Sequence, residues 1–319
     1  MSIMQMLLAT SGGGGVTIGD LFSTDLYTGN GSTKTITNGV DLSSGNNMVW
    51  IYKRNGGAGH VLTDSVRGVT KSIGSDSDGT EVTSSNRITS FNSDGFSLGS
   101  NGFTNSNGDP MVAWTFKGAE GFFDCVTWTG NGTAGRTISH NLNAVPGFIW
   151  VKELSVGDSW ACYHPGLGNT GAVFLNSSST FTVKQGYWNN TSPTSSVFTV
   201  GSDNQVNGSG RSYLAYLFAE DTSNLIKCDD YNGNGGTQTI NCGFQPQFVL
   251  IRCLTSGTHD WVLFDSERTG SKYVRPNNNN AEANHAGFAF ASNGFTLSNS
   301  VGTTNGSGKG YIYMAIAAE

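Results

Sequence analysis

Charged residues are scarce in this chain. Asp, Glu, Lys and Arg together make up 13% of its 319 residues, about half the usual share. Lys and Arg are scattered, with no run of three anywhere, and the net charge is −6. Contacts with a nucleic-acid backbone or an anionic membrane surface need clustered cations. We therefore expect neither partner.

Paired metal ligands are also missing. The histidines are isolated, and the cysteines lack a Cys-x-x-Cys pair, whereas a zinc site needs ligands paired at short spacing. We expect no metal and no cofactor. Buried free thiols are favoured, although a Cys228–Cys242 bridge stays open because both residues lie near one predicted hairpin. The five cysteines are Cys125, Cys162, Cys228, Cys242 and Cys253.

Long hydrophobic runs do not occur either. The first ten residues hold a short apolar stretch without a basic flank, too short to span a bilayer. We expect no secretory signal and no membrane insertion. A glycine linker follows at residues 11–15. The start is either an apolar arm that docks on another subunit or a locally packed or disordered terminus. The anchoring side chains of such an arm would be Met4, Met6, Leu7 and Leu8.

Glycine, by contrast, is abundant, with 45 residues, and a set of landmarks returns three times at intervals of about 100 residues. Tyr-Thr-Gly-Asn-Gly at 27–31 recurs as Trp-Thr-Gly-Asn-Gly at 128–132 and Tyr-Asn-Gly-Asn-Gly at 231–235. An apolar run closed by a base follows each copy, and each unit ends in a second apolar run. The first set of runs occupies 48–53, 148–152 and 248–252, and the second 111–116, 213–218 and 311–316.

These landmarks predict three diverged copies of one unit. The period exceeds the 20–50 residues typical of solenoids, and a unit of this size can bury its own core. We therefore expect three separate domains rather than one continuous stack. The predicted repeats cover 21–119, 120–221 and 222–319, after an N-terminal anchoring arm and glycine linker over 1–20.

The local pattern predicts an all-β fold. Short runs rich in Val, Ile, Thr and aromatics alternate with Asn-Gly and Asp-Gly turns, and no segment keeps a 3.6-residue period. Each repeat should be a β-sandwich, jelly-roll-like, with a closed barrel as the alternative. Pro146 and Pro246 should begin strands. Residues 248–251 are apolar on both faces, which predicts a strand covered by the opposite sheet and by a neighbouring unit or subunit.

Catalytic constellations are not recognisable in the sequence. Asp-x-x-Arg occurs at 64–67 and 265–268, whereas the second repeat has His164 and Leu167. Glycoside hydrolysis needs two flanking carboxylates, and each repeat offers one here. A local ion pair that braces a turn is therefore favoured, and we expect no catalytic residue and no enzymatic activity.

Some aromatic and amide side chains could contact a sugar. The tract of four asparagines that starts at Asn277 could bind hydroxyl groups beside stacking rings, although a solvated loop is favoured. Exposed indoles would be the best stacking platforms. The candidate glycan contacts are Trp188, Trp261, Tyr273, Asn277 and Asn278.

Several segments carry a family resemblance over nearly the whole chain. They are the opening Met-Ser-Ile-Met-Gln-Met-Leu-Leu with its glycine-rich sequel and the segments 25–31, 90–96, 121–132, 136–142 and 145–148. In these segments the chain resembles virion proteins of marine bacteriophages, cyanophages especially. That family is usually labelled tail-fibre-like or virion structural protein, with a repeated domain of unassigned function. The shared motifs are turn and core signatures, which say nothing of catalysis.

The resemblance implies a non-enzymatic structural component of a bacteriophage virion, assembled in the host cytoplasm. A tail fibre or tail-associated appendage that contributes to host attachment is the leading interpretation. The alternatives are a capsid decoration protein or head fibre, a glycan-binding receptor-recognition module, and a depolymerase. The implied partners are other tail or capsid proteins through the N-terminal arm, two further copies in a homotrimer, and host surface polysaccharide.

Overall fold

The computed structural model describes residues 16–255, 258–269 and 271–319. Met4, Met6, Leu7 and Leu8, the predicted virion anchor, lie outside these ranges. Strands hold 44% of the residues and helices 5%, so the predicted all-β class is confirmed. The strands form several sheets, and we keep the word repeat for the three sequence-defined segments.

The first repeat is a sandwich of a larger and a smaller sheet. The larger sheet has the order β1 (Phe22–Thr28), β9 (Pro110–Phe116), β3 (Met48–Lys53) and β4 (Val61–Asp64). The smaller has the order β2 (Lys34–Thr37), β8 (Gly95–Leu98) and β7 (Ile88–Asn92). Minor elements are η1 (Ile18–Asp20), β5 (Lys71–Ser72), β6 (Val82–Thr83) and α2 (Gly102–Asn105).

The second repeat has a comparable pair of sheets. Its larger sheet has the order β10 (Phe123–Thr129), β17 (Ser212–Ala219), β12 (Pro146–Glu153), β13 (Ala161–His164), β14 (Gly168–Phe174) and β15 (Thr182–Val183). The smaller sheet pairs β11 (Arg136–Ser139) with β16 (Val197–Val200). The short helices are η2 (Pro165–Leu167) and α3 (Asn204–Asn207).

The third repeat is built in the same way. Its larger sheet has the order β18 (Asp221–Thr222), β19 (Ile226–Asn232), β27 (Gly310–Ala317), β21 (Pro246–Cys253), β22 (Val262–Asp265), β23 (Lys272–Val274) and β24 (Ala283–Asn284). Its smaller sheet has the order β20 (Gln238–Asn241), β26 (Gly294–Leu297) and β25 (Phe288–Ala291).

The pairing within each repeat is nested, as in a jelly roll. The first long strand pairs antiparallel with the last, at Phe22–Phe116, Phe123–Phe218 and Ile226–Ile316. The second pairs antiparallel with the next to last, as β2 does with β8. The apolar runs at 48–53, 148–152 and 248–252 lie in β3, β12 and β21, and Pro146 and Pro246 begin their strands. Both sequence predictions are confirmed.

The Gly-Asn-Gly landmark has a physical cause in each repeat. In the first, a Cβ on Gly29 would lie 2.0 Å from the Ser106 carbonyl oxygen, and Gly31 has a φ of +63°. Gly29 thus has no room for a side chain, and Gly31 has a backbone conformation that side-chain-bearing residues rarely adopt. Asn105, which is fully buried, clamps the turn by accepting from the Asn30 amide at 2.9 Å. Asn207 and Asn305 clamp the other two turns in the same way.

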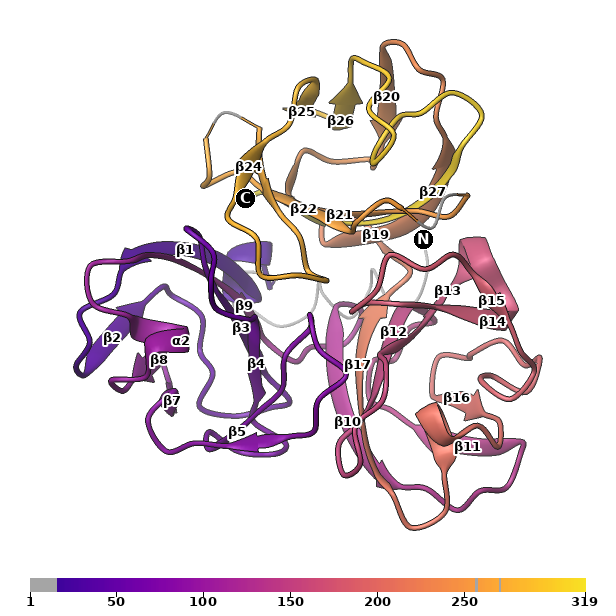
Figure 1. Ribbon diagram of the computed structural model, residues 1–319, viewed down its shortest axis with the longest axis horizontal. Coiled ribbons are helices and arrows are strands. Elements are labelled where there is room, and N and C mark those ends of the chain that lie inside the picture. Colours follow the sequence, from indigo (N-terminus) through magenta and orange to yellow (C-terminus); the bar gives the residue numbers. More distant parts are fainter. Residues whose placement is uncertain (1–15, 256–257, 270) are drawn as a thin grey trace.

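The repeats form three lobes around a common centre (Figure 1). One hydrophobic cluster contains residues of all three, because each larger sheet packs one face on its own smaller sheet and the other on its neighbours. Phe116 shows this sharing: its ring centroid lies 5.7 Å from that of Phe218 and 6.0 Å from that of Phe248. The predicted cover of residues 248–251 by a neighbouring unit is therefore present. Whether each repeat folds alone, and where its boundaries fall, stay predictions.

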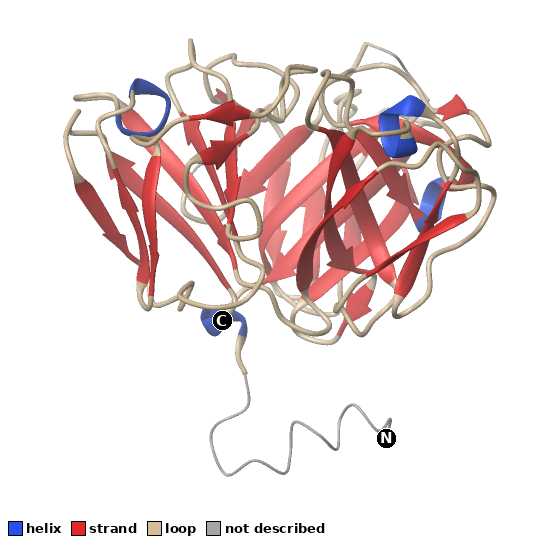
Figure 2. Cartoon of the chain, turned by 90° about the horizontal axis from the view of Figure 1, so that it is seen from below, coloured by secondary structure: helices blue, strands red, loops and turns tan. Residues whose placement is uncertain are grey.

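The two ends of the ring differ. Figure 2 shows η1 and the C-terminal residues together at the lower end, which we call the basal end. The central strands begin at this end, near Met48, Phe148 and Phe248. They run toward the opposite end, where Tyr52, Lys152 and Arg252 lie. All five cysteines are buried and unbridged, so the prediction of free thiols is confirmed and the Cys228–Cys242 bridge is not formed.

Candidate functional site: the seams and the basal cleft

The buried polar side chains gather at the three seams, by which we mean the contacts between neighbouring repeats. Near the end of each central strand, one side chain donates to a backbone oxygen of the preceding repeat around the ring. The three pairs are the Tyr52 hydroxyl with Asn280 O, Lys152 Nζ with Asp78 O at 3.0 Å, and Arg252 Nη2 with Ser179 O at 2.6 Å. Donors and acceptors follow one another around the ring in one sense, as in a head-to-tail cyclic assembly.

A second layer of seam contacts uses ring nitrogens. Each reaches a carbonyl oxygen of the neighbouring repeat, with His60 in the place of the tryptophans of the other two repeats. The pairs are His60 Nε2 with Arg275 O at 3.0 Å, Trp160 Nε1 with Gly74 O at 2.8 Å, and Trp261 Nε1 with Phe174 O at 2.9 Å. The indole of Trp261 thus links the second and third repeats through a hydrogen bond.

The Asp-x-x-Arg pairs form a third layer. Arg268 Nε donates to Asp265 Oδ2 at 2.7 Å, and Trp114 Nε1 of the first repeat donates to the same oxygen at 3.0 Å. Asp64 likewise pairs with Arg67 and accepts from the Tyr216 hydroxyl of the second repeat at 2.9 Å. The local ion pair is present as predicted. Its second role, accepting a hydrogen bond from the neighbouring repeat, was not predicted.

The seam between the second and third repeats has no aspartate at this position, because the neighbouring repeat offers no side chain that would donate to it. The position of Trp114 and Tyr216 is occupied by Met314 in the third repeat, and a thioether has no hydrogen to donate. His164, which stands in place of the aspartate, lies with Nε2 3.2 Å from the Tyr313 carbonyl oxygen instead. Acid and donor are therefore replaced together at this seam.

The hydrogen bonds of the two buried seam histidines, His60 and His164, can form only when the imidazole ring is neutral. Trp50 Nε1 donates to His60 Nδ1 at 3.0 Å, and the Gly166 amide donates to His164 Nδ1 at 3.1 Å. Each ring therefore donates through Nε2 and accepts through Nδ1. Burial, which penalises the charged form, lowers the pKa of His60 to about 3 and that of His164 to about 4.

We expect these histidines to make the fold acid-sensitive. The folded pKa lies below the unfolded value of 6.5, so the unfolded state binds protons first as the pH falls. Their contribution is complete above about pH 6.5 and declines by about 1.4 kcal/mol per pH unit for each histidine, down to about pH 4 for His164 and about pH 3 for His60. Urea unfolding at pH 7 and pH 4.5 measures the decline. His60→Trp, which installs the residue of the other repeats, should reduce the slope, and an unchanged slope would contradict the assignment.

The predicted sugar platforms are not exposed. Trp188 is 1% exposed and Trp261 0%, so neither indole has the exposure that a stacking platform would need. Trp188 Nε1 donates to Gly171 O at 2.9 Å, and its ring meets that of Tyr163 edge-on at 5.8 Å. Packing against the rest of the fold covers each ring, leaving no face for a sugar to stack on.

The other sugar candidates are engaged within the protein. Asn277 accepts from the Trp261 amide at 3.0 Å and donates to Asp260 at 2.7 Å. Asn278 accepts from the Asn280 amide at 3.1 Å. The Arg275 guanidinium lies over the Tyr273 ring at 4.7 Å. The asparagine tract contributes to the seam between the first and third repeats, where Asn279 O accepts from the Gly57 amide at 3.0 Å.

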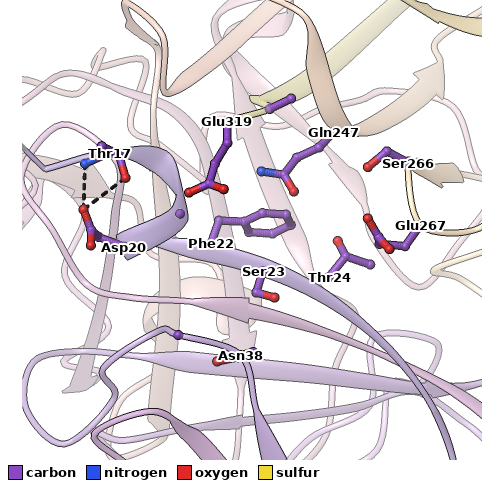
Figure 3. Close-up of a pocket in the computed structure, with 13 residues that line it drawn as sticks. Thr17, Asp20, Phe22, Ser23, Thr24, Asn38, Gln247, Ser266, Glu267 and Glu319 are labelled. Atoms are coloured by element: carbon purple, nitrogen blue, oxygen red, sulfur yellow. Dashed lines mark hydrogen bonds between the residues drawn. The ribbon is translucent and has the colours of Figure 1, made fainter.

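A cleft of about 540 Å³ opens at the basal end, between the first and third repeats (Figure 3). Its carboxylates come from η1, from the loop after β22 and from the C-terminus: Asp20, Glu267 and Glu319. Among the described residues, no Lys, Arg or His lines it. The lining is Thr17, Gly19, Asp20, Phe22, Ser23, Thr24, Asn38, Gly39, Gln247, Ser266, Glu267, Ala318 and Glu319.

The polar groups of this basal cleft are unevenly satisfied. Asp20 accepts from the Thr17 amide at 2.8 Å. Glu267 and Glu319 make no hydrogen bond or ion pair with another described residue, and the Thr24 hydroxyl is buried without a partner. Behind the cleft, burial raises the pKa of Asp25, and the charge of Glu267 raises it further. The site therefore holds uncompensated acceptors that no sequence motif indicated.

Comparison with known proteins adds a family but no activity. No curated protein matches the sequence. A solved structure described as "The Triple Jelly Roll Fold and Turret Assembly in an Archaeal Virus" is 10% identical, over 93% of this chain and 89% of that one. Its TM-score of 0.17 is too low to carry an argument.

The described residues contain neither a membrane-spanning helix nor a metal-binding group. Across 16–255, 258–269 and 271–319, no helix combines the length and apolarity needed to cross a membrane. Within the same ranges, no three His, Cys, Asp or Glu side chains converge in a way that could hold a metal ion.

The model of a domain of unknown function, DUF7483, matches residues 17–319. The chain therefore belongs to the DUF7483 family.

Proposed function

We propose that this chain is a non-enzymatic structural component of a bacteriophage virion, a tail fibre or tail-associated appendage that contributes to host attachment. The observation that carries the proposal is the position of the buried ionisable side chains, which lie in the contacts between repeats. His60, Asp64, Asp265 and Arg252 all fasten one repeat to the next. The side chains that could perform catalysis thus hold the three repeats together, which suits a structural protein. The sequence resemblance is the reason to place that protein in a bacteriophage virion.

A homotrimer belongs to the same proposal. The shared core already joins the three repeats of one chain around a centre, so contacts between chains would come from outside this ring, including the N-terminal arm. Light scattering distinguishes a single chain of 33.6 kDa from a species three times heavier. A single-chain mass at micromolar concentration would contradict the trimer.

Labelled particles test the virion assignment. We expect antibody fragments against this chain to decorate the tail in electron micrographs of purified phage. Decoration of the capsid would support the alternative, a decoration protein or head fibre. Absence of the chain from purified particles, measured by mass spectrometry, would contradict both.

The non-enzymatic part has its own test. Incubation of the protein with host surface polysaccharide should release no reducing sugar. Release that is abolished by Asp64→Asn or Asp265→Asn would overturn the proposal. Both candidate indoles are buried, and Arg275 lies over the Tyr273 ring, so we do not propose glycan recognition as a second function.

A further inference from the structure

The basal end carries three related clefts, and comparison of them isolates one. In the first long strand of each repeat, the second position is Ser23, Asp124 or Lys227. Each of these residues lines one cleft, with volumes of about 540, 370 and 460 Å³ respectively. The clefts therefore share a framework and differ in their charges.

The cleft at the seam of the first and second repeats is satisfied internally. Its Asp124 accepts from Asn46 Nδ2 at 2.7 Å through one oxygen and from the Asn141 amide at 2.7 Å through the other. The cleft of the third repeat supplies its own cation. Lys227 Nζ lies 3.1 Å from an Asp221 oxygen and 3.6 Å from an Asp229 oxygen. In each of these two clefts the charged residue of the first long strand already has its partners within the protein.

The basal cleft between the first and third repeats has no such compensation. Ser23 replaces the charged residue of the other two, and it donates to Asp25 at 3.3 Å. Glu267 and Glu319 therefore face the cleft without a cation among the described lining residues. A second observation points the same way: the Thr24 side chain, 9% exposed, lines the cleft with a buried hydroxyl that has no partner.

We propose that the basal cleft receives a cationic side chain, arginine or lysine, from a segment of a partner protein. Guanidinium and ammonium groups donate several charge-assisted hydrogen bonds to carboxylates. The Thr24 hydroxyl is an additional acceptor on the first-repeat wall, across from Glu267 of the third repeat (Figure 3). The cleft is large enough for one long side chain with its flanking backbone.

The arrangement of the carboxylates selects an extended organic cation over a metal ion. Three acids line the cleft, yet the described side chains do not converge in a metal-binding group. Carboxylates spread along a cleft suit a ligand whose donors are spread as well. The inference concerns the cleft alone and holds whether or not the chain is a virion protein.

Calorimetric titration of the full chain with N-acetyl tri-arginine amide tests the proposal, with N-acetyl tri-citrulline amide as the neutral isostere. We expect heat of binding for the arginine peptide alone. Affinity should fall as salt rises, because Glu267 and Glu319 are exposed to screening. Glu267→Gln combined with Thr24→Val should weaken binding by about tenfold, the effect of losing one charge-assisted contact.

Matched variants make the result specific. Asp78→Asn removes an exposed acid at the opposite end of the ring, and Glu120→Gln removes one from the cleft of the first and second repeats. Both should bind as the parent does. Equal weakening by all the acid variants, no effect of the double variant, or equal binding of the citrulline peptide would overturn the proposal. An unchanged thermal midpoint of the double variant verifies that it folds.

Discussion

Replacing Asp265 by alanine should destabilise the protein by about 3–5 kcal/mol, the cost of breaking a buried ion pair from one side. The carboxylate and the Arg268 guanidinium are both fully buried. Loss of the carboxylate leaves that charge unpaired, and it also leaves Trp114 Nε1 of the first repeat without its acceptor. Urea unfolding at pH 7 measures the change.

The second–third seam supplies the matched control for this prediction. There the corresponding set is His164, Leu167 and Met314, which contains no carboxylate. Introducing that set as Asp265→His, Arg268→Leu and Trp114→Met should restore much of the stability that Asp265→Ala loses, because acid, base and donor leave together. A triple variant as unstable as the single one would show that the acid acts through something other than these partners.

Phe116→Ala should cost about 3–5 kcal/mol and lower the midpoint of one common unfolding transition. Its ring centroid lies 5.0 Å from that of Phe22, 5.6 Å from that of Phe123 and 6.0 Å from that of Phe248. The cavity would thus open where all three repeats meet. Scanning calorimetry measures the effect, and the calorimetric and van 't Hoff enthalpies should agree.

A phenylalanine on the outside provides the comparison. Phe91 packs against the second hydrophobic cluster, which belongs to the first repeat alone, so Phe91→Ala should cost less. Three resolved transitions, only one of them shifted by Phe116→Ala, would instead show repeats that unfold independently. That outcome would support the sequence-based expectation of three separate domains.

The sequence predicted strands better than it predicted surroundings. Residues 248–252 read as a central strand because their apolar pattern is local, and the Gly-Asn-Gly turns were found because Gly31 needs a positive φ. The burial of Trp188 and Trp261 was not foreseen when they were named as candidate sugar contacts, because what covers an aromatic ring depends on segments distant in the chain. Hydrophobic pattern alone could not supply that cover.

The seam contacts and the basal cleft could not be predicted from the sequence for a related reason. Asp265 and its donor Trp114 are separated by more than a repeat, and only the ring brings them together. The basal cleft joins residues near 20, near 267 and at the C-terminus. Its signal is a difference between corresponding positions, Ser23 against Asp124 and Lys227, which becomes meaningful once the strands are aligned in space.

The path of the chain makes one seam unlike the others. The polypeptide passes from the first repeat to the second and from the second to the third, whereas the first and third meet through side chains and hydrogen bonds alone, such as Arg54 with Glu282 at 2.9 Å. Residue 19 and the C-terminal Glu319 lie side by side at that junction. Opening of this closure needs no linker to stretch, so amide exchange should be fastest along it. A covalent bridge between residues 19 and 319 would close the ring at this seam and should slow that exchange.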